Sequence, residues 1–244
     1  QTRFFNFWKD KDPWKDFPTE WKAIYTHTPQ YISLKEEGKS EEEIDAIMKK
    51  PIKMSIYDYI SNGSKDTLMS PYDSIRYHRM ILQNGFMAVD PGSGFVRAWV
   101  GGVNYKYFQY DHVNINTKRQ IGSTFKPFVY TVAIRDKGYS PCFRVPNQLV
   151  TFEKDDPRFG LLQDWTPHNS DGKYGGTLSL KQALANSINT VTAYLMHEIS
   201  PGPVVELVKK MGIVSDVPAQ PSICLGSADI SLFEMVGAYT TYAN

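Results

Sequence analysis

The sequence has few of the residues that build covalent or metal-bound frameworks. Only Cys142 and Cys224 are present among 244 residues, too few for a disulfide framework, and both are expected to pack as small hydrophobic side chains. The five histidines are scattered, with no H-x-x-x-H pair and no E-x-x-H. The sequence therefore predicts no metal site, and nothing in it points to a cofactor.

Long apolar runs and an excess of one charge are also missing. No apolar run approaches the roughly 18 residues of a membrane span, and the first residues lack the charged-then-apolar layout of a signal peptide. The 27 Lys and Arg nearly balance the 26 Asp and Glu, which gives no electrostatic reason to expect nucleic acid. We expect the chain as given to be soluble and to act on a small molecule or a peptide.

Residues 1–84 differ from the rest of the chain in their pattern of residue types. Aromatic and charged residues alternate irregularly there, and prolines interrupt the pattern. One helix is predicted over residues 40–51, where Ser40 and Glu43 form a capping box, and a strand is predicted within residues 51–59. This region is interpreted as a linker or small accessory subdomain, with a partly ordered connection as the alternative.

The pattern of elements is clearer from residue 85 onward. Two apolar runs around a Pro-Gly-Ser-Gly turn predict a β-hairpin over residues 85–102. Residues 139–177, rich in Pro, Asp, Asn and Gly, are expected to be mostly loop. Apolar residues at helical spacing predict helices over residues 123–138, 178–199, 202–212 and 227–244. The last helix reaches the end of the chain without a stop signal, which suggests a fragment.

A serine and a lysine stand three residues apart at the start of the helix predicted over residues 123–138. Ser123 and Lys126 would share one helix face, and the neighbouring Phe125 and Phe128 supply the apolar surroundings that lower the pKa of a lysine. Such a lysine can remove the proton of a serine nucleophile, and the helix N-terminus favours an oxyanion. In the alternative interpretation, Ser123 is an ordinary N-cap and Lys126 is a solvated first-turn lysine.

The spacing S-x-x-K is weak evidence taken alone. In a chain of this composition it is expected by chance about once, and a second match is present at Ser170 and Lys173. That second match contains Asp-Gly and is expected to be a turn. Further along, Ser187 and Asn189 form the chain's only S-x-N and could present a hydroxyl and an amide from a helix junction into a cleft. They could equally be exposed positions on an amphipathic helix.

Four blocks of sequence together carry a resemblance to a known family. In chain order they are "GFMAVDPGSGFVRAWVGG", "RQIGSTFKPFVY", "WTPHNSDGKYGGTLSLKQALANSINTVTAYL" and "ICLGSADISLFEMVGAYTTYAN". They resemble the transpeptidase domain of class A (bifunctional) penicillin-binding proteins over residues 85–244. The resemblance implies part of the α+β penicillin-recognising serine transpeptidase fold, which is β-lactamase-like, with antiparallel strands and a helical subdomain.

The resemblance also implies an activity and a set of site residues. Ser123 would attack the penultimate D-Ala carbonyl of a peptidoglycan stem peptide ending in D-Ala-D-Ala, and Lys126 would take its proton. Ser187 would relay a proton to the leaving amine, and Asn189 would hold Lys126 and the substrate backbone. An amine of a second stem peptide would resolve the acyl-enzyme, and β-lactams would acylate the same serine. The expected location is the periplasmic, extracytoplasmic face of the cytoplasmic membrane, to which the parent protein would be anchored.

The sequence departs from the family pattern in two places. No K-[ST]-G occurs in the 244 residues, although that strand normally closes the cleft, and no E-D-x-x-F block of a glycosyltransferase domain is present. We therefore expect residues 1–84 to be a linker or accessory region and residues 85–244 to be the first part of a transpeptidase domain. As supplied, the chain is expected to react weakly or not at all with β-lactams.

Two rival functions remain open at this point. A D,D-carboxypeptidase or a β-lactamase shares the motifs, but the E-x-x-L-N of class A β-lactamases is absent. A non-catalytic module for wall or partner binding would account for the missing K-[ST]-G. The residues that follow in the parent gene would decide between an enzyme and a scaffold.

Overall fold

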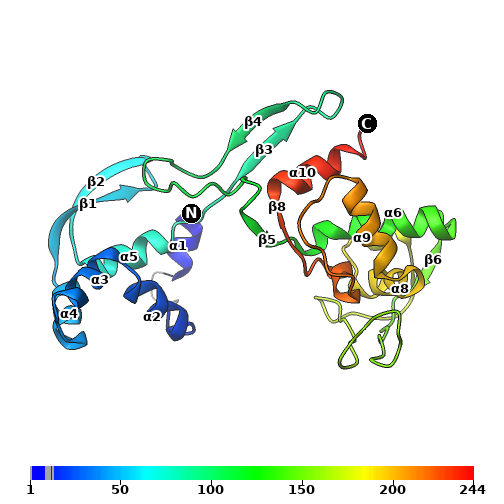
Figure 1. The fold of residues 1–244 in the computed structure, drawn as a ribbon, viewed down its shortest axis with the longest axis horizontal. Coiled ribbons are helices and arrows are strands. Elements are labelled where there is room, and N and C mark those ends of the chain that lie inside the picture. Colours follow the sequence, from blue (N-terminus) through cyan, green and yellow to red (C-terminus); the bar gives the residue numbers. More distant parts are fainter. Residues whose placement is uncertain (1, 9–11, 13) are drawn as a thin grey trace. The chain divides into compact units, whose positions relative to one another are not determined.

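The computed structural model describes residues 2–8, 12 and 14–244, which form two compact units (Figure 1). The first unit comprises residues 1–84 together with 103–109, and the second comprises residues 85–102 together with 110–244. Within the described part of the chain, no helix combines the length and the apolarity needed to cross a membrane.

The first unit combines short helices with one β-hairpin. The predicted strand is β1 (Ile52–Asp58), which pairs antiparallel with β2 (Gly63–Met69). The helices are α1 (Thr2–Trp8), α2 (Pro18–Thr26), α3 (Pro29–Glu36), α4 (Glu41–Met48) and α5 (Pro71–Arg79). The capping box predicted at the start of α4 is confirmed, because the Ser40 hydroxyl accepts the Glu43 N–H and the Glu43 carboxylate accepts the Ser40 N–H.

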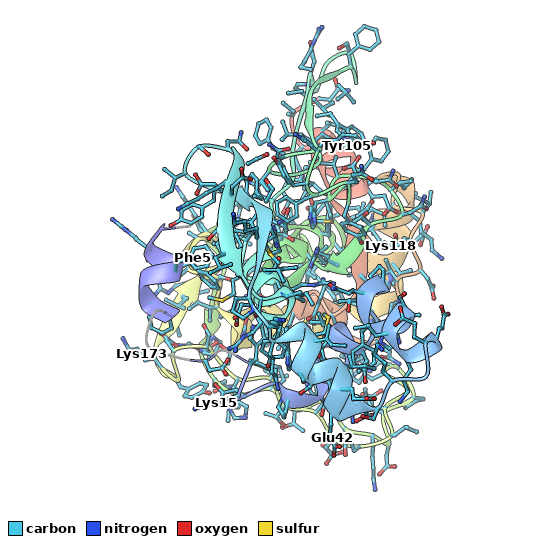
Figure 2. The ribbon with its side chains drawn as sticks, turned by 90° about the vertical axis from the view of Figure 1, so that its left-hand side faces the viewer. Phe5, Lys15, Glu42, Tyr105, Lys118 and Lys173 are labelled. Carbon is cyan, nitrogen blue, oxygen red and sulfur yellow. The ribbon has the colours of Figure 1, made fainter. Side chains whose placement is uncertain are left out.

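The sequence interpretation missed four described helices of this unit, α1, α2, α3 and α5, and at the last three it took prolines as interruptions. Pro18, Pro29 and Pro71 instead begin α2, α3 and α5, where a proline loses no hydrogen bond that the helix would have made. Among its described residues, the unit has its own small apolar core of four buried side chains, Tyr25, Tyr31, Ile44 and Met48. The acidic first turn of α4 faces outward, as the labelled Glu42 illustrates (Figure 2).

The second unit begins with the predicted hairpin. Strands β3 (Phe86–Val89) and β4 (Val96–Val100) pair antiparallel, with a shift of register between Ala88 and Val89. Two further antiparallel pairs join distant segments: β5 (Lys118–Gln120) pairs with β8 (Asp229–Ser231), and β6 (Arg144–Pro146) pairs with β7 (Thr177–Ser179). Together with the helices, these pairs give the mixed α+β architecture that the family resemblance implied.

The helices of the second unit surround one large apolar core. They are α6 (Lys126–Lys137), α7 (Leu180–Ala185), α8 (Asn189–Ile199), α9 (Pro201–Lys210) and α10 (Leu232–Thr240), with short 3-10 helices η1 (Gly122–Phe125) and η2 (Pro221–Leu225). Helix α6 packs against α8 and α9 (Figure 1). Its buried side chains, which include Phe128, Val129 and Val132, belong to this core. Gly138 ends α6 in the left-handed conformation, as predicted.

Three sequence predictions for this unit are wrong. Residues 229–231 of the helix expected over residues 227–244 form strand β8, and helix α10 begins only at Leu232. The helix expected over residues 178–199 is two helices, α7 and α8, separated at Asn186, Ser187 and Ile188. Cys142 is exposed rather than packed, because it lies in the turn before β6, whereas Cys224 is buried as expected. The break between α7 and α8 is the feature on which the site depends.

Candidate active site

Ser123 and Lys126 lie at the junction of η1 and α6. Gly122 enters this turn with φ +56°, Ser123 follows it, and Lys126 is the first residue of α6. The side chain of Phe125, between them, is fully buried against Phe128, with ring centroids 5.3 Å apart. The sequence therefore directs the aromatic rings into the core next to the exposed Ser123 and the first residue of α6, Lys126.

Lys126 is a buried lysine and not a solvated one. Its side chain is 1% exposed, although lysine is almost never fully buried without a partner. Its Nζ donates to the Ser187 carbonyl oxygen at 2.6 Å, to Ser187 Oγ at 3.0 Å and to Asn189 Oδ1 at 2.7 Å. Three acceptors match the three N–H groups of a lysine, so the amine is fully hydrogen-bonded.

The break between α7 and α8 presents these acceptors. Ser187 adopts φ +55°, the left-handed conformation, which a non-glycine residue rarely takes and which prevents α7 from continuing into α8. Asn189 is the first residue of α8, and its Nδ2 donates to the His168 carbonyl oxygen at 2.8 Å. The alternative in which Ser187 and Asn189 occupy one exposed helix face is therefore wrong.

Burial changes the acid–base behaviour of Lys126. Desolvation lowers the pKa of its amine to about 8, and no salt bridge with a carboxylate is found for Lys126 among the described residues to oppose this. The buried Cys224 thiol lies close enough to interact electrostatically, and burial raises the pKa of that thiol to about 12. At pH 7 about a tenth of amines with such a pKa are neutral and able to accept a proton.

Ser123 is exposed and does not serve as the N-cap of α6. Phe125 occupies the N-cap position and no side chain caps the helix there; the Lys126 backbone N–H instead donates to the Ser123 carbonyl oxygen. Within the described part of the chain, no hydrogen bond of the Ser123 hydroxyl is found. The amine of Lys126 is thus directed toward Ser187 and Asn189, and the Ser123 hydroxyl is open to solvent one turn earlier.

A tight backbone contact holds the turn that carries Ser123. The Gly122 N–H donates to the Gly226 carbonyl oxygen at 3.0 Å, and Gly226 itself adopts φ +75° at the end of η2. A Cβ atom at Gly226 would lie 1.9 Å from the Gly122 carbonyl oxygen, which no side chain can do. Only glycine allows η2 to approach the turn so closely.

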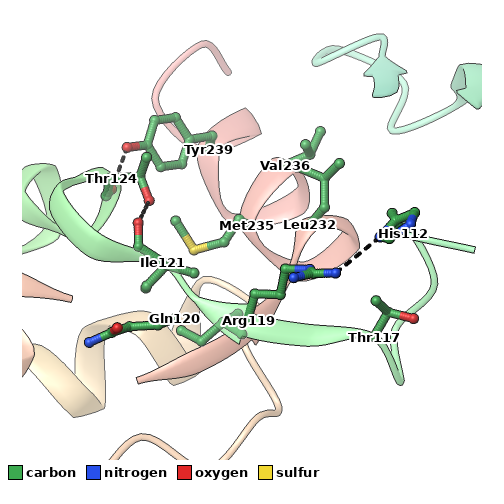
Figure 3. Close-up of a pocket in the computed structure, with 11 residues that line it drawn as sticks. His112, Thr117, Arg119, Gln120, Ile121, Thr124, Leu232, Met235, Val236 and Tyr239 are labelled. Carbon is green, nitrogen blue, oxygen red and sulfur yellow. Dashed lines mark hydrogen bonds between the residues drawn. The ribbon is translucent and has the colours of Figure 1, made fainter. Parts of the chain in front are cut away.

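A cavity of about 430 Å³ lies beside this turn, on the side of α10 (Figure 3). Apolar side chains of α10, including Leu232, Met235 and Val236, form one wall, and Arg119 and Gln120 of β5 form another. Tyr239 donates its hydroxyl to the Thr124 carbonyl oxygen at 2.6 Å and so ties α10 to η1. Ser123, Lys126, Ser187 and Asn189 do not line this cavity.

The second S-x-x-K is a turn, as expected. The Lys173 N–H donates to Asp171 Oδ1 at 3.0 Å, and the Lys173 side chain is exposed (Figure 2). Its lysine therefore differs from Lys126 in burial and in every polar contact. No group of three or more His, Cys, Asp or Glu side chains that could hold a metal ion is found among residues 2–8, 12 and 14–244.

The sequence interpretation did not assign a role to Asn169 or Cys224, although both are buried next to the cluster. Asn169 accepts hydrogen bonds from the backbone N–H groups of Asn189 and Thr190. The only sequence signal for either residue was its place in a quoted family block: Asn169 lies in the third block and Cys224 in the fourth.

Comparisons with known proteins identify the family. The model of the penicillin-binding protein transpeptidase domain matches residues 84–244, and the model of the penicillin-binding protein middle domain matches residues 7–82. Penicillin-binding protein 1A of Neisseria gonorrhoeae is 33% identical over 165 residues, which are 67% of this chain and 20% of that protein. The chain thus spans about a fifth of the length of the curated relatives that it matches.

Solved structures agree with this at the level of the fold. Penicillin-binding protein 1A from Haemophilus influenzae matches 78% of this chain and 26% of its own chain, with a TM-score of 0.61 and 20% identity. A penicillin-binding protein from Mycobacterium tuberculosis matches 91% of this chain and 56% of its own, with a TM-score of 0.53 and 21% identity. The resemblance seen in the four sequence blocks is confirmed, and this chain belongs to the penicillin-binding protein transpeptidase family.

Proposed function

We propose that this chain is part of a peptidoglycan D,D-transpeptidase that cross-links stem peptides through a serine acyl-enzyme. One observation carries the proposal. Lys126, the first residue of α6, is fully buried, and its amine is hydrogen-bonded by Ser187 and Asn189, while Ser123, three residues earlier, is exposed. A structural lysine gains nothing from such burial, because removing the charged amine from water costs free energy. A base must have its pKa lowered in this way.

Each of the four residues has a role in the proposed reaction. Ser123 Oγ attacks the penultimate D-Ala carbonyl carbon, and its proton passes to the neutral amine of Lys126. When the C–N bond to the terminal D-Ala breaks, Ser187 relays the proton to the leaving amine. Asn189 accepts a hydrogen bond from Lys126 at Oδ1, and its side-chain amide also contacts the substrate backbone.

The acyl-enzyme is resolved by a second stem peptide. Its amine attacks the ester carbonyl carbon, the Ser123 Oγ–C bond breaks, and the amine proton returns through the same relay to Ser123. β-Lactams acylate Ser123 by the same attack, and the opened ring keeps the leaving amine attached. The substrate is wall peptide, so the domain acts on the extracytoplasmic face of the membrane, to which the parent protein is anchored.

We also propose that the chain is divided into two regions with different roles. Residues 85–244 are the first part of the catalytic domain, and residues 1–84 are an accessory region of the parent protein. No K-[ST]-G strand is present in the 244 residues, so the second oxyanion donor that the family pattern requires is missing here. Acylation of this chain by β-lactams is therefore expected to be weak.

The test is covalent labelling with a fluorescent penicillin, read on a denaturing gel as a time course. We expect slow labelling of the 244-residue chain and fast labelling of a chain extended through a downstream K-[ST]-G, both lost in Ser123→Ala and Lys126→Met. Ser170→Ala, in the exposed turn, is the matched control and labels like the parent chain. Labelling that survives Ser123→Ala would overturn the proposal.

A further inference from the structure

Helix α8 begins without a cap of its own. Its N-cap residue, Ile188, has no side-chain oxygen, and no side-chain cap bond is made from that position. The first two backbone N–H groups of the helix, those of Asn189 and Thr190, both donate to Asn169 Oδ1, at 3.0 and 3.1 Å. The helix that carries Asn189 is thus capped by a residue from the loop 20 positions earlier in the chain.

The capping side chain is itself held on its other side. Asn169 is 7% exposed, and its Nδ2 donates to Asn147 Oδ1 at 2.9 Å and to the Lys173 carbonyl oxygen at 2.8 Å. Asn147 Oδ1 also accepts the hydroxyl proton of Thr190, at 2.6 Å. Two acceptors face one end of the Asn169 amide and two donors face the other, so the network admits only one orientation of that amide.

The residue before Asn169 orients the side chain of Asn189. The His168 carbonyl oxygen accepts Asn189 Nδ2 at 2.8 Å, which leaves Asn189 Oδ1 to accept the proton of Lys126 Nζ. Residues 168 and 169 therefore fix both the backbone at the start of α8 and the orientation of the Asn189 side-chain amide.

All three acceptors of the Lys126 amine depend on this segment. Two belong to Ser187, in the break directly before α8, and the third belongs to Asn189, at its first position. Loss of the Asn169 oxygen would leave two N–H groups at the start of α8 without an acceptor, and unpaired buried donors are costly enough to shift a helix start or to admit water. Either response displaces the oxygens that hold Lys126.

We propose that Asn169 is a positioning residue: it caps α8 from the loop and thereby holds Asn189 and Ser187 against the Lys126 amine. The inference rests on the proposed function in one respect, namely that Lys126 is the proton acceptor of Ser123. Asn147 helps to hold this arrangement, because its Oδ1 accepts hydrogen bonds from both Asn169 and Thr190.

Hydrogen exchange at the lysine amine tests this in the 244-residue chain without requiring any enzymatic activity. At pH 6 an amine with a pKa of about 8 carries its proton. In protein with ¹⁵N-labelled lysine, the Nζ–H signal of Lys126, assigned by its loss in Lys126→Met, should exchange far more slowly than that of the exposed Lys181. In Asn169→Ala we expect Lys126 exchange to accelerate about tenfold or more.

Two further variants separate positioning from general stability. Asn186→Ala is the control, because Asn186 is exposed and its Nδ2 donates only to the Gln182 carbonyl oxygen; Lys126 exchange should stay at the parent value. Asn169→Asp keeps an oxygen for the two N–H groups of α8 while losing the hydrogen bonds that Nδ2 donates to Asn147 Oδ1 and to the Lys173 carbonyl oxygen. This variant should have a lower melting temperature, while the Lys126 amine should still exchange slowly. If Asn169→Ala fails to fold, the exchange of Lys126 in Asn169→Asp still tests the inference.

The outcomes distinguish this inference from the proposed function. If Asn169→Ala melts at a lower temperature but leaves Lys126 exchange unchanged, or if Lys126 in the parent chain exchanges as fast as Lys181, Asn169 is not a positioning residue. If penicillin labelling proves indifferent to Ser123 and Lys126 while the exchange results are as expected, the proposed function fails and the positioning of the amine stands.

Discussion

The side-chain nitrogen of Lys126 lies 2.7 Å from Oδ1 of Asn189, a residue 63 positions later in the chain. Helix α6 supplies the amine and the start of α8 supplies the amide, and the two helices pack against each other through the large core. The contact therefore depends on the packing of two helices, and disturbing either one changes the acid–base behaviour of the lysine.

The low pKa of Lys126 should appear as a pH dependence of stability. The pKa in the folded state is about 8 against 10.5 for an ordinary lysine, so between these values the unfolded chain binds more protons and stability rises with pH. Lys126→Met lacks this titration. The free energy of unfolding of the parent chain, relative to Lys126→Met, should increase by up to about 3 kcal/mol from pH 8 to pH 10.5.

Urea denaturation of both proteins at several pH values in that window measures the difference. The other groups titrate nearly alike in the two proteins and so largely cancel. The Cys224 thiol, which interacts with Lys126, has a pKa of about 12 in the folded parent chain and therefore keeps its proton there throughout this window. Two curves that run parallel from pH 8 to pH 10.5 would contradict a lowered pKa of Lys126 in the folded state.

Glu234 should give the stability of the fold a second pH dependence, which comes from a hydrogen-bonded carboxylate and not from a desolvated amine. It is 4% exposed, and although burial alone would raise its pKa, hydrogen bonds from Ser231 and Ser215 lower the pKa to about 2. The carboxylate accepts the N–H and the hydroxyl of both serines, which ties the start of α10 to the loop after α9. Glu234→Gln should cost about 3 kcal/mol at pH 7, because an amide donor would then face these donors.

The advantage of the parent chain over Glu234→Gln should disappear in acid. It is complete above the ordinary glutamate pKa of about 4.5 and is lost as pH falls from there toward 2, since the folded pKa is the lower one. Thermal melts at pH 7, 4 and 3 report this. An advantage that is undiminished at pH 3 would argue against the lowered pKa.

Gly226 should tolerate no side chain, for a reason beyond its backbone conformation. Gly212 also has a positive φ, +93°, but has open space where a Cβ would stand, so Gly212→Ala should cost only the conformational strain of about 1 kcal/mol. Gly226→Ala adds the overlap with Gly122 and should cost about 3 kcal/mol or more. It should also slow labelling of Ser123, which Gly212→Ala should leave intact.

Chemical denaturation and penicillin labelling of the two alanine variants provide the measurements. Equal destabilisation by the two substitutions would mean that the backbone of η2 moves away from Gly122 at no cost.

The two thiols should differ sharply in reactivity. Cys142 is exposed, while Cys224 is buried with its pKa raised to about 12. A colorimetric disulfide reagent at pH 8 should therefore modify one thiol rapidly, and the second only after urea is added. Cys142→Ser should abolish the fast phase, and a fast phase that survives this substitution would place Cys224 at the surface.

Local elements with strong end signals were predicted well from the sequence. The capping box of α4, the hairpin β3–β4 and the end of α6 at Gly138 were all expected, because residues within one turn of each feature determine it. The helices begun by Pro18, Pro29 and Pro71 were missed, because a proline marks a helix start and a helix break equally well until its neighbours are placed.

The division of residues 178–199 into α7 and α8 could not be predicted from periodicity. The apolar stripe continues through the break, because Leu184 and Ile188 both pack against the core in spite of it. What ends α7 is the left-handed conformation of Ser187, and what starts α8 is Asn169, from a loop that the sequence interpretation left without structure.

The sequence by itself determined the family, the order of the motifs and the residues that could carry the chemistry, since these depend on residue type and spacing along one chain. Only the tertiary structure decided between a solvated Lys126 and a buried one, and between a helix face and a helix break at Ser187. The physical reason is that burial and hydrogen bonding of the amine come from segments about 60 residues apart, which only packing of α6 against α8 brings into contact.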